Sequence, residues 1–326
     1  MSNSIRKIGI MTSGGDSPGM NAAIRAVVRT SLYHEMEVFG IRRGYQGMIE
    51  GDIFQMKTTD VSNIINRGGT ILKTARSKEF FTEAGRQKAY DQIQQHGIEA
   101  LVLIGGDGTF RGAVKFFEEH TIPAVGIPGT IDKDLAGTDY TIGFDTAVNT
   151  AVEAIDKIRD TAEAHDRLFV IEVMGRDAGY IALNSGISCG AEDILIPEQV
   201  HNISEVLNRI DHDERRKKTV HIIVVAEGDD GGAKNLSKSI KERFPLLDTR
   251  ICVLGHIQRG GAPTFADRVL ASRLGFAAVN AIREDRTQVM IGVINGDLSY
   301  TPFHNAIKEN SPISADMLEM IRVLSH

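Results

Sequence analysis

Short apolar runs rich in β-branched residues alternate along the chain with longer segments of helical apolar spacing. The runs are bounded by glycine, proline or charged residues, which is typical of strands buried in a parallel sheet. They predict strands at Ile8–Met11, Leu101–Ile104, Ala124–Ile127, Leu168–Val173, His221–Ala226 and Arg250–Leu254. The segments between them predict helices at Met20–Tyr33, Phe110–His120, Phe144–Ala164, Ser204–Arg215 and Pro263–Glu284. The alternation predicts an α/β fold with mostly parallel sheets flanked by helices.

The length, charge and cysteine content narrow the class of protein. A chain of 326 residues is long for one domain and short for three, so we expect two α/β domains. A formal net charge of −6 disfavours a nucleic-acid binder, although local arginine clusters can still bind small anions. Cys189 and Cys252 lack disulfide or zinc spacing, which favours a reducing, cytoplasmic location. No apolar run approaches about 18 residues and no signal core opens the chain, so we expect no membrane partner and no secretion.

The loops after the predicted strands form the candidate site, because ligands of such sheets bind beyond the carboxyl ends of the strands. The first two, 12–21 (TSGGDSPGMN) and 105–109 (GGDGT), place glycines before a helix, where backbone N–H groups can approach phosphate oxygens. One such loop is as well explained by a tight turn, but two favour phosphate binding, without a Walker motif. The later loops are 128–134 (PGTIDKD), 174–176 (MGR), 227–228 (EG) and 255–261 (GHIQRGG).

Three carboxylates in these loops suit phosphoryl transfer. Asp107 is placed to hold Mg²⁺ beside nucleotide phosphates. In an extended loop, Asp132 and Asp134 would point to the same side, where one of them can take the proton from an attacking hydroxyl group. A lone Asp-x-Asp is usually a solvated turn, but this pair directly follows a strand end, which favours a functional role.

Cationic side chains also gather in or near these loops. Arginine binds phosphate through paired hydrogen bonds and neutralises charge on a transferred phosphoryl group, so the cluster indicates at least two bound phosphates. Its members are Arg76, Arg167, Arg176, Arg250, His256 and Arg259, each of which alone would more often be a surface or structural residue. Arg25 and Arg29 share a helix face, and with residues 215–218 they form either a second anion site or two solvated faces.

These motifs occur in the order found in the bacterial ATP-dependent 6-phosphofructokinases, a family that the chain resembles from near its first residue to about residue 300. The segment 139–145 (DYTIGFD) adds to the likeness. GGDGT alone is weak, since NAD kinases and diacylglycerol kinases share it, but the ordered set ending in GHIQRGG is specific. The resemblance implies an ATP-binding domain at 1–143 with 258–308 and a sugar-phosphate-binding domain at 144–257 with 309–326. It also implies an active site in the interdomain cleft.

The family's reaction moves the γ-phosphoryl group of ATP to the 1-hydroxyl of fructose 6-phosphate, giving fructose 1,6-bisphosphate in glycolysis with Mg²⁺ as cofactor. The resemblance implies that Asp132 is the general base, that Arg76 and Arg176 stabilise the moving phosphoryl group, and that Asp107 holds the metal with Asp134 nearby. Thr130 and Asp134 complete the implied catalytic residues. The implied ATP-binding residues are Gly14, Arg76, Ser77, Gly106, Asp107, Gly108 and Thr109. The implied substrate-binding residues are Thr130, Ile131, Asp132, Arg167, Met174, Gly175, Arg176, Glu227, Arg250, His256, Ile257, Gln258 and Arg259.

The resemblance further implies a homotetramer with shared sites, in which Arg167 and Arg250 reach in from a neighbouring subunit. An effector site for ADP or phosphoenolpyruvate would contain Arg25, Arg29, Arg159, Gly190, Glu192, Arg216 and Lys218. Thr58, Lys217 and Val220 stand where the family has Arg, Gly and His, which predicts a weak or altered effector response.

Other positions bear on the donor and on catalysis. The pyrophosphate-dependent relatives carry Asp where Gly108 stands and Lys where Gly129 stands, so the two glycines imply ATP. Lys133 replaces the family's Asn; pointing inward it would favour the ionised form of Asp132 and weaken it as a base, and pointing outward it would change little. Tyr180 stands where the family has Asp, which predicts altered packing. Two alternatives stay open, a pyrophosphate or other sugar-phosphate enzyme of the same fold and a non-catalytic, nucleotide-binding paralogue.

Overall fold

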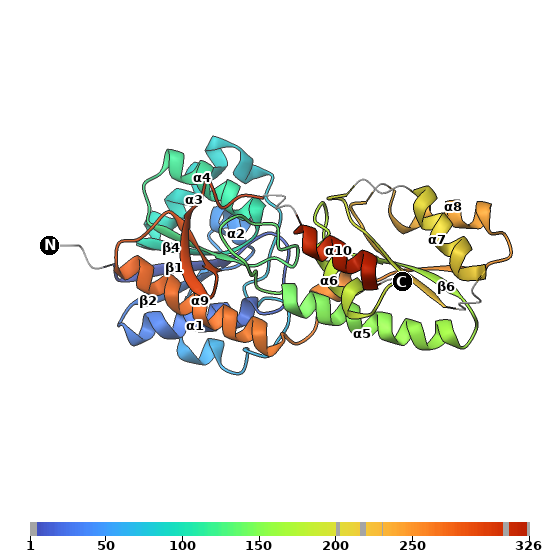
Figure 1. Cartoon of the computed structure of the whole chain (residues 1–326). Helices are drawn as coiled ribbons and strands as arrows, with labels where there is room; N and C mark the ends of the chain where they lie inside the picture. Colours follow the sequence, from blue (N-terminus) through green and yellow to red (C-terminus); the bar gives the residue numbers. More distant parts are fainter. Residues whose placement is uncertain (1–4, 200–202, 216–219, 230, 309–312, 325–326) are drawn as a thin grey trace. The chain divides into compact units, whose positions relative to one another are not determined.

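The computed structural model describes residues 5–199, 203–215, 220–229, 231–308 and 313–324 (Figure 1). The chain divides into two compact units, each with its own sheet. Unit 1 comprises Met1–Thr146 and Arg259–Glu309, and unit 2 comprises Ala147–Gln258 and Asn310–His326. The chain leaves unit 1 after Thr146 and returns at Arg259, so more than one segment passes between the units and no single linker joins them.

Unit 1 is built on a sheet with the strand order β11-β10-β5-β4-β1-β2-β3. The strands are β1 (Lys7–Thr12), β2 (Glu37–Ile41), β3 (Ile53–Met56), β4 (Ala100–Gly105), β5 (Ala124–Pro128), β10 (Val289–Ile294) and β11 (Asp297–Pro302). The five inner strands run parallel, and the edge strands β3 and β11 are antiparallel to their neighbours. The helices are α1 (Met20–Tyr33), α2 (Gly44–Glu50), η1 (Thr58–Val61), η2 (Glu79–Phe81), α3 (Glu83–Gln95), α4 (Asp107–Glu119) and α9 (Phe265–Arg283).

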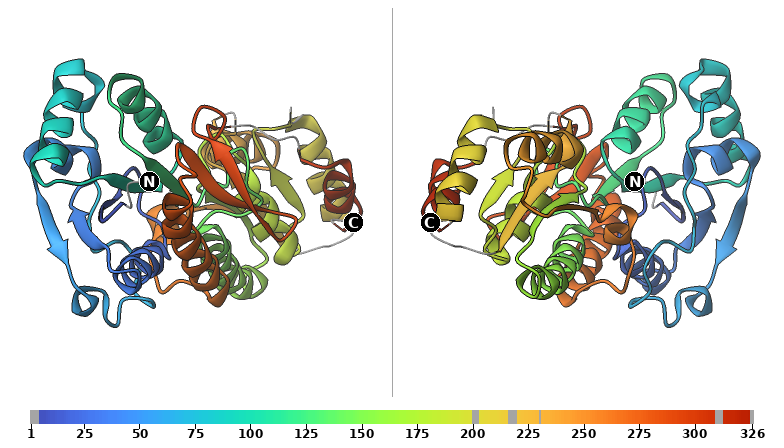
Figure 2. Two further views of the ribbon diagram at one scale, coloured as in Figure 1. Left: turned by 90° about the vertical axis from the view of Figure 1, so that its left-hand side faces the viewer. Right: turned by 90° about the vertical axis from the view of Figure 1, so that its right-hand side faces the viewer.

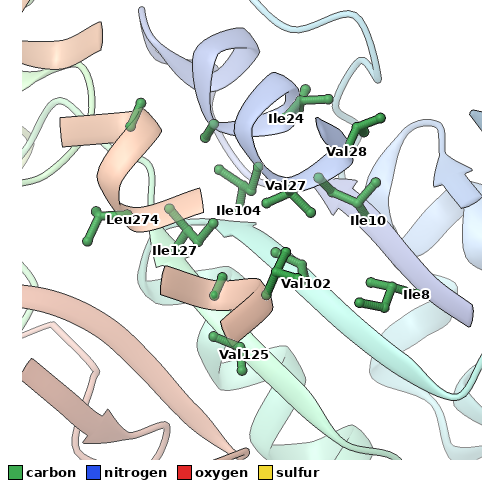
Figure 3. Packing of buried hydrophobic residues seen from close by; sticks show 14 of the residues in the cluster. Ile8, Ile10, Ile24, Val27, Val28, Val102, Ile104, Val125, Ile127 and Leu274 are labelled. Atoms are coloured by element: carbon green, nitrogen blue, oxygen red, sulfur yellow. The ribbon is translucent and has the colours of Figure 1, made fainter. Parts of the chain in front are cut away.

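Both faces of this sheet are buried. Alternate side chains of each inner strand point to opposite faces, and each face is covered by helices. On β4, Val102 and Ile104 pack in one apolar cluster and Leu101 and Leu103 in another. α1 and α9 lie side by side over the first face, and α2, α3 and α4 cover the second (Figures 1 and 2). Figure 3 shows the first cluster, with labelled side chains Ile8, Ile10, Ile24, Val27, Val28, Val102, Ile104, Val125, Ile127 and Leu274.

Unit 2 contains an all-parallel sheet with the strand order β7-β8-β6-β9. Its strands are β6 (Leu168–Val173), β7 (Asp193–Leu195), β8 (His221–Ala226) and β9 (Thr249–Val253). Its helices are α6 (Tyr180–Ser188), α7 (Ile203–Arg215), α8 (Gly232–Arg243) and α10 (Ala315–Leu324); α5 (Phe144–Glu163) and η3 (Gly255–Arg259) begin or end at the unit boundary. Side chains of α7 and α8 bury one face of the sheet.

The predicted strands and helices are all present, with small shifts at their ends. The largest shift concerns the helix expected at Phe110, which begins at Asp107 and so includes the carboxylate of the GGD loop. Within the described residues, no helix is both long enough and apolar enough to cross a membrane.

Candidate active site

Three loops of unit 1 meet at the carboxyl ends of β1, β4 and β5. The N–H of Ser13 donates to the carbonyl of Ile104 at 3.0 Å, and the N–H of Gly129 donates to the carbonyl of Gly105 at 2.9 Å. A Cβ on Gly105 would lie 2.6 Å from the carbonyl oxygen of Ser13, so only glycine allows this approach. The parallel sheet therefore brings together the loops 12–16, 105–109 and 128–134, as the sequence predicts.

The first turn of α4 lies at the centre of this junction. Gly106 is the N-cap of the helix, and a Cβ on it would lie 3.4 Å from Cβ of Thr130. A Cβ on Gly14 would lie 3.5 Å from Oγ1 of Thr109, so the first two loops also touch. A Cβ on Gly108 would meet nothing within 4 Å. The helix start thus faces open space, and its first N–H groups and partial positive charge suit an anion.

Tyr45 stabilises the first turn of α4, although the sequence pattern did not single it out. Its buried hydroxyl donates to the carbonyl of Thr109 at 2.7 Å, and its ring stacks on Phe80 at 3.9 Å between centroids. Burial raises the pKa of the Tyr45 hydroxyl far above its ordinary value, so the group remains a hydrogen-bond donor. α2 and η2 are thereby fixed to the loop that begins α4.

Asp107 stands where a metal ligand is expected, with its carboxylate already ordered. Oδ1 accepts hydrogen bonds from Nε of Arg111 at 2.9 Å and from the N–H of Lys308 at 2.7 Å, and Oδ2 accepts from the same Nε at 2.8 Å. Among the described residues, no group of three His, Cys, Asp or Glu side chains could hold a metal ion. Mg²⁺ is often bound through one or two carboxylates, water and substrate phosphates, so a single aspartate at an anion site fits it.

The loop after β5 buries both of its carboxylates. Asp132 and Asp134 are each 5% exposed, and the N–H of Asp132 donates to Oγ1 of Thr130 at 3.2 Å. The expectation of an extended loop is wrong, because Lys133 between them has φ of 55°, in the left-handed region. A tight turn, rather than the alternation of an extended chain, therefore sets the directions of the two side chains.

Arg76 and Ser77 lie in the segment between η1 and η2. Arg76 is exposed, and Oγ of Ser77 accepts the N–H of Phe80 at 3.2 Å. Two buried polar residues hold the base of this segment, Thr12 at the end of β1 and Asn21 in the first turn of α1. Oγ1 of Thr12 donates to the carbonyl of Lys73 at 2.9 Å, and Nδ2 of Asn21 donates to the carbonyl of Arg67 at 3.0 Å. These contacts join residues far apart in sequence, so no local pattern predicts them.

Arg259, expected in the sugar-phosphate site, belongs to unit 1. A Cβ on Gly15 would lie 3.2 Å from Nη1 of Arg259, so this guanidinium group lies against the loop 12–16. Arg259, a residue expected to bind the sugar phosphate, therefore lies directly beside the first loop expected to bind ATP.

In unit 2, the loops after β6 and β8 pack on each other. The N–H of Arg176 donates to Oε1 of Glu227 at 2.9 Å, and a Cβ on Gly228 would clash with the carbonyl of Arg176. Met174 is buried, and its N–H donates at 3.3 Å to Oε1 of the fully buried Gln258. Four expected substrate residues are thus joined in two pairs, each by a hydrogen bond from a backbone N–H to a side-chain oxygen.

The turn of η3 completes this group in unit 2. Nε2 of Gln258 donates to the carbonyl of Gly255 at 3.0 Å, which fixes the turn. His256 and Ile257 between them are exposed. Gln258 is therefore a structural member of the set, while the side chains of His256 and Ile257 are exposed.

Arg167 and Arg250 meet at a carboxylate that the sequence pattern did not single out. β6 and β9 are neighbours, and Asp248 lies between the two arginines, 2.7 Å from Nε of Arg167 and 2.8 Å from Nε of Arg250. Their hydrogen bonds lower the pKa of the Asp248 carboxyl group. Within this chain, both arginines thus form surface ion pairs, and the pairing also places their guanidinium groups side by side.

The expected effector residues fall into groups on the two units. Arg25 and Arg29 lie on α1 in unit 1, where burial and the charge of Arg29 lower the pKa of Arg25. In unit 2, Nη2 of Arg159 donates to the carbonyls of Cys189 at 2.7 Å and Gly190 at 3.1 Å. Glu192 also lies in unit 2, and the expected residues Arg216 and Lys218 lie outside the described part of the chain.

Comparison with known proteins places these motifs in one family. The sequence model described as Phosphofructokinase matches residues 7–282. The ATP-dependent 6-phosphofructokinase of Cytophaga hutchinsonii is 56% identical over 322 residues, covering 98% of this chain and 98% of that protein. The ATP-dependent 6-phosphofructokinase 1 of Thermus thermophilus is also 56% identical over 322 residues, covering 98% of this chain and 100% of that protein.

Solved structures agree with the sequence relatives. The phosphofructokinase of Saccharomyces cerevisiae superposes with a TM-score of 0.86 at 35% identity. The superposition covers 98% of this chain and 46% of the yeast chain, so this chain spans about half the length of that protein.

Proposed function

Because the chain belongs to the phosphofructokinase family, we propose that it transfers the γ-phosphoryl group of ATP to the 1-hydroxyl of fructose 6-phosphate. The reaction named for its relatives at 56% identity over nearly their whole length supports this proposal. The observation that carries it is the meeting of three loops around the open N-terminus of α4, next to the buried Asp132.

Asp132 is the proposed general base. Phosphoryl transfer needs little covalent chemistry from the protein, so positioning and charge neutralisation dominate. The loop 128–134 holds the carboxylate in a buried turn, where it can accept the proton of the attacking hydroxyl group. Arg76 and Arg176 are the proposed cations for the moving phosphoryl group, and Thr130 and Asp134 complete the catalytic set.

Unit 1 would bind ATP and unit 2 most of the sugar phosphate. Asp107 would hold Mg²⁺, which when bound supplies charge neutralisation at the nucleotide phosphates. The residues of unit 2 proposed for the sugar phosphate include Met174, Gly175, Glu227 and His256, with Arg259 from unit 1. In this chain Arg259 already lies against the loop 12–16, where it can bind a phosphate close to the nucleotide.

The nature of the donor depends on two glycines. Gly108 faces open space, which leaves room for the phosphates of ATP. A Cβ on Gly129 would lie 3.0 Å from Cε of Met20 and 3.1 Å from Cγ2 of Ile104. Gly129 therefore also has a packing role, so Gly108 is the position that supports ATP over pyrophosphate.

A homotetramer with shared active sites, a cytoplasmic location and an effector site are further parts of the proposal. The edge strand β9 exposes Ile251 by 42% and Val253 by 59%, next to the exposed Arg250. Such a strand edge suits a neighbouring subunit. Both cysteines are free thiols, as in a reducing compartment. ADP or phosphoenolpyruvate would bind near Arg25 and Arg159 with an altered response.

Steady-state turnover with fructose 6-phosphate and Mg²⁺ tests the function, with ATP compared against pyrophosphate. We expect turnover with ATP and little with pyrophosphate. Asp132→Asn should lower kcat about 10²–10⁴-fold, the usual range for a lost general base, while ATP still binds. Rapid turnover by Asp132→Asn would remove this residue as the base, and nucleotide binding without turnover in the wild type would favour a regulatory paralogue.

A further inference from the structure

Lys133 stands between the two buried carboxylates of the loop after β5, in a backbone conformation that lysine disfavours. Its φ is 55°, where the Cβ of most residues is crowded and where Asn is among the better tolerated residues. Asp132 and Asp134 on either side are each 5% exposed, so a change in this turn would redirect both carboxylates. The fold must therefore supply contacts that stabilise the turn.

Two aromatic rings supply such contacts. The ammonium group of Lys133 lies 5.2 Å from the ring centroid of Phe144 and 5.8 Å from that of Tyr140. A cation over an aromatic face is attracted by the ring quadrupole, more strongly when water is excluded. Burial lowers the pKa of Lys133, opposed in part by the carboxylate of Asp139, so the ammonium group is partly shielded from water.

The segment that carries both rings is itself fixed to its surroundings in unit 1. The N–H of Asp139 donates to the carbonyl of Val293 in β10 at 2.7 Å. The N–H of Gly143 donates at 2.7 Å to the buried carboxylate of Asp267 in α9. The rings therefore offer the loop a support that is tied to the sheet and to a core helix.

We propose that Lys133 is a positioning residue, which holds the turn of the catalytic loop by resting its ammonium group on Tyr140 and Phe144. The turn in turn sets the Asp132 carboxylate for proton removal. The inference rests on the proposed phosphoryl transfer and adds the contact that orders its base. This position of Lys133 differs from both the inward and the outward orientation considered from the sequence. Its ammonium group lies near the two rings and interacts favourably with the carboxylate of Asp139.

Four single variants test the role of the ammonium group. Lys133→Met removes the charge at similar length, Lys133→Arg keeps a cation, and Lys133→Asn offers a residue suited to the left-handed turn. Lys7→Met is the matched control, because Lys7 lies 5.8 Å from the ring of Phe39 at the amino end of β1. We expect Lys133→Met to lower kcat about fivefold, because its weak cation–π contacts with both rings are lost, with KM for ATP unchanged. Lys133→Arg, Lys133→Asn and Lys7→Met should keep most of the wild-type kcat.

A double-mutant cycle with Phe144→Leu tests the contact itself. If Lys133 acts through the rings, the losses from Lys133→Met and Phe144→Leu are clearly less than additive, both in kcat and in thermal unfolding, and the contact with Tyr140 accounts for what remains. Additive losses would overturn the proposal, and so would a Lys133→Asn variant as impaired as Lys133→Met. The unfolding data also distinguish a variant that has lost its fold from one in which only the position of the Asp132 carboxylate has changed.

The wild-type assay separates this inference from the proposed function. An active wild type with an equally active Lys133→Met refutes the role of Lys133 alone. A wild type without ATP-dependent turnover refutes the proposed function, and the role of Lys133 in positioning its base with it, whatever the unfolding cycle gives.

Discussion

Gly108 allows a substitution whose effects on stability and on ATP binding should have opposite signs. It is the second residue of α4, and a Cβ there meets nothing within 4 Å. In Gly108→Asp, replacing a helical glycine and adding an acid to the first turn should stabilise the fold by about 0.5–1 kcal/mol. The variant should therefore unfold at a slightly higher temperature than the wild type.

The same carboxylate should oppose the nucleotide. The proposed ATP phosphates lie at this helix start, and two like charges about 4 Å apart repel by about 4 kcal/mol at an effective dielectric constant of about 20. That energy corresponds to an increase in KM for ATP of about 10²–10³-fold. Gly108→Ala is the matched control, because it brings the helical gain without the charge and should change KM for ATP far less.

Thermal unfolding and steady-state kinetics with ATP and with pyrophosphate measure both effects. A Gly108→Asp variant with wild-type KM for ATP would show that the phosphates do not lie at the start of α4. A clear loss of stability in Gly108→Asp would show that there is no room for a side chain at this position. If Gly108→Ala is as impaired as Gly108→Asp, the effect is steric rather than electrostatic.

Two further predictions concern side chains that the sequence pattern did not single out. Asp248→Ala frees Arg167 and Arg250 from their shared partner and should raise KM for fructose 6-phosphate about threefold without changing KM for ATP, as expected for a surface pair. Because those arginines lower the pKa of Asp248, its contribution to stability is present above the ordinary Asp pKa and is lost as pH falls through the lowered value, so unfolding of the wild type and the variant should converge in acid. Arg86 is 8% exposed and bonds Glu119 and the carbonyls of Phe80 and Phe81. Arg86→Met should therefore cost about 2–3 kcal/mol in denaturant unfolding, as expected for lost hydrogen bonds to a charged group, and a cost below about 1 kcal/mol would contradict the pairing.

The central strands and the loops after them could be predicted from the sequence for a physical reason. Strands buried on both faces are continuous apolar runs, as in Leu101–Ile104, and the carboxyl ends of parallel strands share one edge. The weaker elements lack such a signal. α3 is mostly polar and buries few residues, and the edge strand β3 is short and half-exposed.

The finer geometry of the site depends on contacts between distant residues. The left-handed turn at Lys133 depends on rings several residues further on, and local preference alone would favour another residue there. Asp248 meets Arg167 only because β6 pairs with β9. Motif order could identify the loops, but only the fold shows which side chains support them.

Asp267 near the start of α9 bonds the segment where the chain leaves unit 1, and opposing effects act on its carboxylate. It is 1% exposed. Its oxygens accept the N–H of Gly143 at 2.7 Å, the N–H of Thr146 at 2.9 Å and the hydroxyl of Thr146 at 2.5 Å. Burial favours the neutral acid and the three donors favour the ionised form; burial is the larger effect, so the pKa of Asp267 is raised.

The sign of the pH dependence follows from that balance. Because the folded pKa lies above the ordinary Asp value, the stabilisation due to Asp267 is full below the ordinary pKa and is lost as pH rises through the folded value. The neutral Asp267→Asn should therefore stay within about 1 kcal/mol of the wild type at neutral pH, since it avoids burying a charge. Asp267→Ala leaves three buried donors without an acceptor and should cost about 2–4 kcal/mol in acid and less at neutral pH. Denaturant unfolding from pH 4 to pH 8 should show the wild type gaining on Asp267→Asn as pH falls. A gain toward alkaline pH instead would mean that the hydrogen bonds outweigh burial at this carboxylate.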